Sequence, residues 1–369
     1  VDGPSPHDVQ TRLLAWFDAG HRDMPWRRTK DPYRILLAEY LLQRTRVASG
    51  APYYERFLER FPNVESLAAA PEEDVLRSWE GLGFYRRARN LHAAAKAIVQ
   101  EHGGRIPGDA TTLSALPGIG PYTAGAIASI AFGESVPAVD GNVTRVVTRL
   151  FRIEADVTRR AGRARVSEVA RTLVPADRPG RFNQALMELG ATLCTPRQPM
   201  CSDCPFANLC LARSAGLQSA LPRVRPQRKP GVVAVSFALL RSRGRTLLVR
   251  RTDSELLGGL WSLPGGEIPS GQRGPVALRA LVLSQTGLRG GVREKVARVS
   301  HTFSHRRWSG SVYRCILRGR ADLSASARWL TADETRHLPL VPYHRRLLAE
   351  LESPQPLESF HAPGRRRRG

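Results

Sequence analysis

The sequence predicts a multidomain chain in which an all-α region is followed by an α+β region. Its 369 residues exceed the usual length of one domain. Apolar residues recur at helical spacing up to about residue 213, whereas strand-like segments begin at residue 232. A segment dominated by proline and cationic residues separates the two regions. We therefore expect an all-α domain at 1–213, a linker at 214–230, an α+β domain at 231–358 and a basic tail at 359–369.

The first region is expected to consist of helices joined by short turns. Val143, Val146, Val147 and Leu150 show the helical spacing most clearly. Asp31 followed by a proline predicts a helix start, because aspartate caps helix N-termini and proline is favoured in the first turn. The expected helices cover residues 9–17, 33–47, 50–60, 72–79, 86–101, 110–115, 123–132, 143–151, 163–173 and 180–193.

The second region is expected to combine strands with a helix. Residues 232–240 and 246–250 are rich in Val and Leu and flank an Arg-Gly turn, which is typical of a hairpin. The segment Trp261–Glu267 comes next. A helix is expected at 275–286, followed by strands at 292–300 and 309–317.

The charge of the chain points to a polyanionic partner. The formal net charge is +23 and the pI is about 11.1, and almost all of the positive charge is arginine. Arginine binds phosphate through two nitrogens and stacks on bases, so nucleic acid is the expected partner. No apolar run approaches a membrane span and no signal-peptide pattern opens the chain, so we expect a cytoplasmic, nucleoid-associated protein and no membrane partner.

The rest of the chain is organised around the stretch from Leu116 to Asn142. Its Gly118-Ile-Gly120 turn opens a helix whose first amides, from Thr123 on, can bind a phosphate. Asp140 follows about twenty residues later at the start of another helix. A phosphate site followed by a fixed carboxylate suggests chemistry on a nucleic acid sugar. The alternative is a turn between two core helices, with Asp140 or Asn142 as an N-cap.

A second carboxylate, Glu39, falls on the apolar face of the helix expected at 33–47. Ile35 and Leu36 precede it and Leu42 follows it. Burial disfavours the charged form, so the pKa should rise, which suits a general acid near neutral pH. The alternative is a structural glutamate paired with a cation.

The segment Gly81-Leu-Gly-Phe84-Tyr85, followed by Arg86, Arg87 and Arg89, combines a glycine turn with aromatic and cationic side chains. Such a loop can insert a side chain into a base stack. Otherwise, the aromatic residues fill the core and the arginines are solvated.

Four of the five cysteines, Cys194, Cys201, Cys204 and Cys210, fall within residues 194–210. A cluster of thiols in a reducing compartment favours a metal site over disulfides. Zinc and an iron–sulfur cluster both remain open from the spacing. No His or carboxylate adds an open catalytic position, so a structural role is expected.

Residues 1–213 resemble the helix-hairpin-helix DNA glycosylases of the endonuclease III superfamily. Over nearly its full length, the chain resembles the MutY family of adenine glycosylases. The residues that carry the resemblance are Asp31-Pro-Tyr, Glu39-Tyr-Leu-Leu-Gln43, Gly81–Tyr85, Leu116–Tyr122, Val139–Asn142 and the four cysteines. The resemblance implies a six-helix barrel and a [4Fe–4S] module with double-stranded DNA between them. It also implies removal of adenine paired with 8-oxoguanine or guanine, after the base is flipped into a pocket, by a monomer.

The resemblance assigns roles to individual residues. Glu39 is implied as the acid that protonates adenine and Asp140 as the carboxylate that stabilises the oxocarbenium-like sugar, with Tyr122 and Asn142 as supporting partners. Cys194, Cys201, Cys204 and Cys210 are implied as the cluster ligands. The implied DNA contacts are Gln43, Arg44, Phe84, Tyr85, Arg86, Gly118, Gly120, Thr123 and Arg197.

One position argues against a bifunctional glycosylase with lyase activity. Members that resemble endonuclease III carry a Schiff-base lysine just after the Gly-x-Gly turn, where this chain has Tyr122. A phenol cannot form a Schiff base. We therefore expect a monofunctional enzyme. A catalytically inactive DNA-binding protein would lack Glu39 or Asp140, and both are present.

The second domain resembles a Nudix fold. Ser284 and Gln285 stand where a Nudix hydrolase has paired glutamates, so no Mg²⁺ site is expected and a Nudix pyrophosphatase is disfavoured. The resemblance instead implies that Phe303, Ser304 and His305 recognise 8-oxoguanine. The alternative is a hairpin tip without ligand contacts.

Two positions depart from the family pattern. Arg44 replaces a glutamine expected to insert beside the lesion, and Phe84 replaces an intercalating tyrosine. Both replacements still allow stacking. Their effect on the choice of mismatch stays open.

Overall fold

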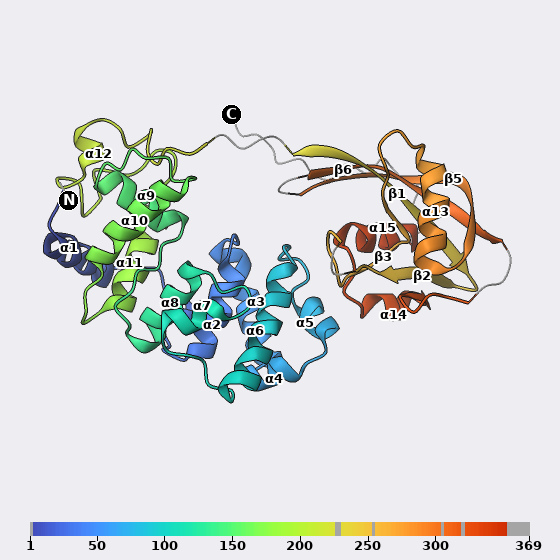
Figure 1. Cartoon of the computed structure of the whole chain (residues 1–369), viewed down its shortest axis with the longest axis horizontal. Coiled ribbons are helices and arrows are strands. Elements are labelled where there is room, and N and C mark those ends of the chain that lie inside the picture. Colours follow the sequence, from blue (N-terminus) through green and yellow to red (C-terminus); the bar gives the residue numbers. More distant parts are fainter. Residues whose placement is uncertain (1–2, 226–229, 253–254, 304–305, 319–321, 353–369) are drawn as a thin grey trace. The chain divides into compact units, whose positions relative to one another are not determined.

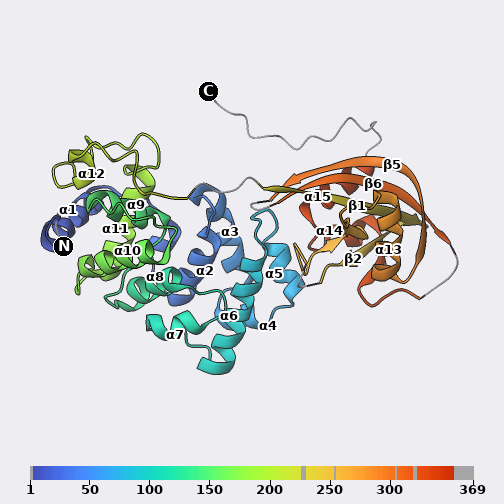
Figure 2. The same cartoon turned by 45° about the horizontal axis from the view of Figure 1, so that its top comes forward.

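The computed structural model describes residues 3–225, 230–252, 255–303, 306–318 and 322–352. Figures 1 and 2 show it in two views. The chain divides into two compact units, one with residues 1–70 and 87–226 and the other with residues 71–86 and 227–369. The first is helical and the second is α+β, which confirms the predicted fold class. The predicted boundaries at 213 and 231 stay a prediction. None of the described helices is long and apolar enough to cross a membrane.

The first unit is built of helices joined by short loops. Asp31 caps the helix that carries Glu39, accepting hydrogen bonds from the amides of Tyr33 and Arg34, as predicted. The helices are α1 (Pro6–Ala19), η1 (Pro25–Arg27), α2 (Pro32–Leu42), α3 (Val47–Arg60), α4 (Val64–Ala69), α6 (Arg86–His102), α7 (Ala110–Ala115), α8 (Pro121–Phe132), α9 (Gly141–Leu150), α10 (Arg160–Leu173), α11 (Pro179–Thr192) and α12 (Leu211–Ser214).

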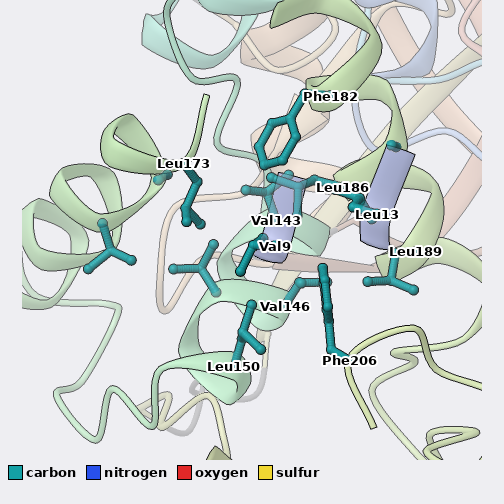
Figure 3. Packing of buried hydrophobic residues seen from close by; sticks show 14 of the residues in the cluster. Val9, Leu13, Val143, Val146, Leu150, Leu173, Phe182, Leu186, Leu189 and Phe206 are labelled. Atoms are coloured by element: carbon teal, nitrogen blue, oxygen red, sulfur yellow. The ribbon is translucent and has the colours of Figure 1, made fainter. Parts of the chain in front are cut away.

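Apolar side chains from distant parts of the chain form the core of this unit. Val9 and Leu13 of α1 lie against Val146 of α9 and Leu186 of α11, and all are buried (Figure 3). Three of the four clustered cysteines pack against the same core. The N-terminal helix therefore closes a bundle that also supports the cysteine segment.

The helix expected at 33–47 is shorter in the structure. Helix α2 ends at Leu42, Arg44 has a positive φ of 58°, and a new helix begins at Val47. A left-handed residue breaks the helical hydrogen-bond pattern. The break turns Gln43 and Arg44 out of the helix into a loop.

The second unit contains α5 (Glu72–Ser78) and a mixed sheet in the order β3-β2-β1-β6-β5, with β4 paired to β1 and β7 to β2. Strands β1 and β6 are parallel, from Gly231 opposite Arg306 to Leu240 opposite Cys315, and β5 and β6 are antiparallel. The strands are β1 (Gly231–Ser242), β2 (Arg245–Arg250), β3 (Trp261–Ser262), β4 (Gly265–Glu267), β5 (Arg289–Thr302), β6 (Arg306–Arg318) and β7 (Ala327–Leu330).

Three further helices complete the second unit: α13 (Gly274–Thr286), α14 (Ala332–Arg336) and α15 (Pro342–Glu352). Leu278 and Val282 of α13 pack on Leu240 of β1, so this helix covers part of the sheet (Figure 1). Strand β7 and the last two helices were not predicted, since their apolar runs are short.

Candidate active site

A pocket in the first unit is lined by side chains from α2, α8, α9 and α11. It brings together Glu39, Tyr122, Asp140 and Asn142, which lie up to about a hundred positions apart in the chain. These are the four predicted catalytic residues. The pocket therefore joins an acid, a phenol and a second carboxylate at one place.

The surroundings of Glu39 favour its neutral form. Its side chain comes from the middle of α2, and the residue is only 8 % exposed. Burial raises its pKa to about 7, and the negative charge of Asp140 adds to the rise, while a hydrogen bond with Tyr122 opposes it. Near neutral pH this carboxyl can therefore hold a proton and give it up.

Asp140 is both the N-cap of α9 and a wall of the pocket. Its Oδ1 accepts a hydrogen bond from the Val143 amide at 2.7 Å, and its Oδ2 accepts one from Nδ2 of Asn142 at 2.9 Å. Burial raises its pKa above the ordinary value, and these hydrogen bonds oppose the rise. The capping alternative is therefore confirmed for Asp140, and its catalytic role stays a prediction.

Asn142 is fixed from the side away from Asp140. Its Oδ1 accepts a hydrogen bond from Nη2 of Arg145 at 2.8 Å, and Arg145 also donates to the carbonyls of Gly190 and Cys194. A Cβ atom at Gly190 would lie 2.6 Å from Cβ of Asn142, so only glycine lets α11 approach this closely. The supporting contacts of Asp140 are therefore themselves held rigidly.

Another wall of the pocket holds a buried charge that the sequence analysis missed. Glu188 of α11 pairs with Arg22 at 2.7 Å and with Arg27 at 2.8 Å. Burial would raise its pKa, but hydrogen bonds from both arginines outweigh burial and lower it to about 2. The signal was present, because Glu188 falls between Leu186 and Leu189 on a helix, as Glu39 does among apolar residues.

The glycine turn before α8 has the conformation expected of a phosphate-binding hairpin. Gly118 has a φ of 75°, and a Cβ there would meet Asn90 at 2.5 Å. Gly120 is the N-cap of α8, and both glycines are exposed. The hydroxyl of Tyr40 donates to the carbonyl of Pro117, so the turn is tied to α2 beside Glu39.

The loop after α2 is held by one arginine. Nη1 of Arg87 donates to the carbonyls of Tyr40 and Leu41, to the Gln43 carbonyl and to Oγ1 of Thr45. These carbonyls lie at the C-terminus of α2, where helices leave acceptors unsatisfied. A buried cation at this point explains why the helix ends at Leu42.

Other predicted DNA contacts differ in their exposure. Phe84, with a positive φ of 50°, is 45 % exposed, and Arg86 and Arg197 are exposed. Tyr85 is 3 % exposed, so its side chain is packed inside, and its contact with DNA stays a prediction. The Thr123 side chain is also buried. Nε2 of Gln43 donates to its hydroxyl at 3.2 Å, which links the loop after α2 to the start of α8.

The four clustered cysteines line one pocket together with Arg149 and Gln218. Burial raises the pKa of the Cys204 thiol to about 11, so a bound metal is needed to keep it as a thiolate at neutral pH. Among the described residues, no three His, Cys, Asp or Glu side chains converge on one ion position.

In the second unit, Phe303 lies at the end of β5, with its ring 5.0 Å from Trp308 and 4.5 Å from His301. Ser304 and His305 lie outside the described residues. Gln285 accepts from the amide of Gly265 at 2.7 Å and donates to its carbonyl at 3.1 Å. This side chain thus joins α13 to β4, at the position where a Nudix hydrolase has a glutamate.

Comparison with protein families gives two matches. Residues 37–172 match the HhH-GPD superfamily base excision DNA repair proteins, and residues 235–350 match the NUDIX domain. The first match contains Glu39, Tyr122, Asp140 and Asn142. The second covers most of the described sheet.

Comparison with individual proteins agrees with these matches. The adenine DNA glycosylase of Rattus norvegicus is 37% identical, over 88% of this chain and 74% of the relative. That of Mycolicibacterium smegmatis is 44% identical, over 59% of this chain and 74% of the relative. Among solved structures, a thermostable thymine-DNA glycosylase aligns with a TM-score of 0.53 and 31% identity, covering 57% of this chain and 97% of that protein.

Proposed function

The chain belongs to the adenine DNA glycosylases, and we propose that it hydrolyses the N-glycosidic bond of adenine paired with 8-oxoguanine or with guanine. It acts as a monomer on double-stranded DNA, in the cytoplasm at the nucleoid, and flips the adenine into the pocket. The observation that carries the proposal is the meeting of Glu39, Tyr122 and Asp140 in that pocket. The products are free adenine and an abasic site.

Glu39 acts as the general acid. With a pKa of about 7, Glu39 carries a proton in about half of the protein molecules at neutral pH. Adenine leaves readily only when a ring nitrogen is protonated, so proton donation by Glu39 makes the base a leaving group. The phenol of Tyr122 lies beside the carboxyl, and its hydroxyl donates to Sδ of Met187 at 3.4 Å.

Asp140 acts as the anion beside the sugar. As the C–N bond breaks, positive charge develops on the deoxyribose, and an ionised carboxylate stabilises it. The hydrogen bonds from Val143 and Asn142 favour this ionised form. Water then adds to the anomeric carbon and gives its proton to the carboxylate of Glu39, which had lost its own proton to the adenine, and this completes the hydrolysis.

The enzyme is monofunctional. A lyase needs an amine that attacks the sugar and forms a Schiff base. Tyr122 occupies the position of that amine, and no lysine is found among the described residues that line the pocket. Water is therefore the nucleophile.

The cysteine segment holds a [4Fe–4S] cluster. Four thiols around one pocket are the donor set that such a cluster uses. Among the described residues, the buried Oε1 atom of Gln218, which lines the same pocket, finds no hydrogen-bond partner, and such an atom points to a group that binds there. Cys194, Cys201, Cys204 and Cys210 would hold the cluster and so fix the fold of the 194–210 segment, where Arg197 is exposed for contact with a phosphate.

The Nudix-like domain recognises the base opposite the adenine. Phe303 packs on Trp308 at the hairpin, and Ser304 and His305 follow with groups that can hydrogen-bond a purine edge. Because Gln285 is used to join α13 to β4, the domain is a binding module rather than a pyrophosphatase.

End-labelled duplexes test the proposal. Adenine is placed opposite 8-oxoguanine, guanine or thymine, and a fourth duplex carries an oxidised pyrimidine. Breaks in the adenine strand are expected only after hot alkali, and only for the two mispairs. Breaks without alkali would show a lyase, and release from the A·T duplex would contradict the specificity.

A further inference from the structure

Arg149 of α9 is a buried cation that the reaction does not use. It lies one helical turn after Arg145 and is 2 % exposed. Its Nε donates to the carbonyl of Leu221 at 2.9 Å and its Nη1 to that of Thr195 at 2.8 Å. Its Nη1 also lies 3.3 Å from Sγ of Cys194. The guanidinium therefore contacts both the start of the cysteine segment and the chain that leaves it.

No carboxylate balances this charge in the part of the chain that the structure describes. The hydrogen-bond partners of the guanidinium are all neutral. They are the Sγ atom of Cys194 and the backbone carbonyls of Thr195, Pro196 and Leu221. Arg27 beside the candidate active site, which is half-buried, pairs instead with the carboxylate of Glu188. A buried charge is unfavourable unless an opposite charge accompanies it.

The cysteine pocket offers the missing negative charge. Arg149 lines it with Cys194, Cys201, Cys204 and Cys210. Arg213 lines it too, but its side chain is exposed and hence solvated. Four thiolates around a [4Fe–4S] cluster carry a net negative charge that a buried cation would balance.

We propose that Arg149 is the counter-cation of the cluster, and that by donating to Cys194 Sγ it sets the reduction potential of the cluster. The inference rests on the proposed cofactor. Hydrogen bonds and positive charge at the sulfurs favour the form of a cluster that has more electrons. Loss of this cation therefore makes the cluster easier to oxidise. Arg149 is a positioning residue for the cofactor and does not touch DNA or adenine.

Three variants test the proposal: Arg149→Met removes the charge, Arg149→Lys keeps it, and Arg152→Met is the matched control. Arg152 follows the same helix but is exposed and pairs with Glu154. For each purified variant we would measure iron and sulfide content, the visible absorbance of the cluster, its midpoint potential, and the rate at which ferricyanide bleaches it.

We expect a more negative potential and several-fold faster bleaching for Arg149→Met, with Arg149→Lys and Arg152→Met close to the parent protein. If Arg149→Met holds no cluster, the lysine variant decides: a full cluster with the parent's potential supports the charge role. A methionine variant with unchanged potential and bleaching would overturn the inference, as would a lysine variant that behaves like methionine. A parent protein without iron would instead refute the proposed cofactor.

Discussion

Arg145 donates a hydrogen bond from Nε to the backbone carbonyl of Cys194 at 2.6 Å. The same guanidinium holds Asn142, which in turn donates to the carboxylate of Asp140. One side chain thus connects the first cysteine of the 194–210 segment to the carboxylate of the active site. Three hydrogen bonds therefore link the two ends.

Replacement of Arg145 should therefore slow base release. Arg145→Met leaves Asn142 free to rotate away from Asp140, and a hydrogen bond to a charged group contributes about 1.5–3 kcal/mol. We expect the single-turnover rate of adenine release to fall roughly tenfold to a hundredfold. Arg152→Met is the control. An unchanged rate in a folded Arg145→Met protein would mean that Asn142 does not orient Asp140.

Glu39→Gln should abolish adenine release and keep DNA affinity. The amide fills the same volume but cannot donate a proton to the base, and general acid catalysis contributes about 10²–10⁴-fold. The measurements are single-turnover release and equilibrium binding to a duplex with adenine opposite 8-oxoguanine. A variant that retained most of its rate would show that another group protonates the adenine.

The raised pKa of Glu39 also predicts how stability depends on pH. The folded protein holds this proton up to about pH 7, whereas the unfolded chain loses it near 4.5. The free energy of unfolding therefore falls as pH rises from about 4.5 to 7. Above that window Glu39 lowers it by about 3 kcal/mol. Glu39→Gln lacks this penalty and should be stabilised relative to the parent at pH 8 more than at pH 5. Denaturant unfolding at both pH values checks this, and equal differences would contradict the buried, protonated carboxyl.

The same pKa sets the pH profile of the reaction. The rate of adenine release under single-turnover conditions should fall as pH rises through about 7, because the protonated fraction of Glu39 falls. A profile that rises through this range would assign the acid role to a different group.

Arg87→Met should impair the loop that carries Gln43 and Arg44. The arginine holds the last carbonyls of α2, and without it Arg44 is free to leave its left-handed conformation. We expect weaker binding to the mispair and slower extrusion of 2-aminopurine, which is monitored by its fluorescence. Arg87→Lys should recover both in part. Tight binding and normal extrusion would show that Arg87 only stabilises the fold.

The double variant Ser304→Ala with His305→Ala should lose preference for 8-oxoguanine over guanine opposite the adenine. The hydroxyl and imidazole are the groups proposed to read the purine edge. Ser284→Ala, on the exposed side of α13, is the control and should change nothing. The ratio of release rates for the two mispairs is the measurement, and full preference in the double variant would refute the assignment.

Local signals in the sequence were enough to predict the burial and raised pKa of Glu39 and the helix start at Asp31. Each depends on residues within one or two turns of the same helix, so spacing reveals them. The break after Leu42 could not be predicted in this way, because Arg87, which binds the carbonyls there, lies about forty positions later. Glu188 carries the same local signal as Glu39, but its ion pairs could not be predicted, since Arg22 and Arg27 are 166 and 161 positions away.

Asp140 begins helix α9 with the same carboxylate that lines the pocket. A mutation to alanine at this position therefore removes a helix cap as well as the carboxylate. The protein loses stability even where its activity is not needed. Asparagine caps a helix as well as aspartate does. Replacement of Asp140 by asparagine would therefore remove the carboxylate and keep the helix cap. An asparagine at position 140 would be the mark of a relative that retained its fold and gave up hydrolysis.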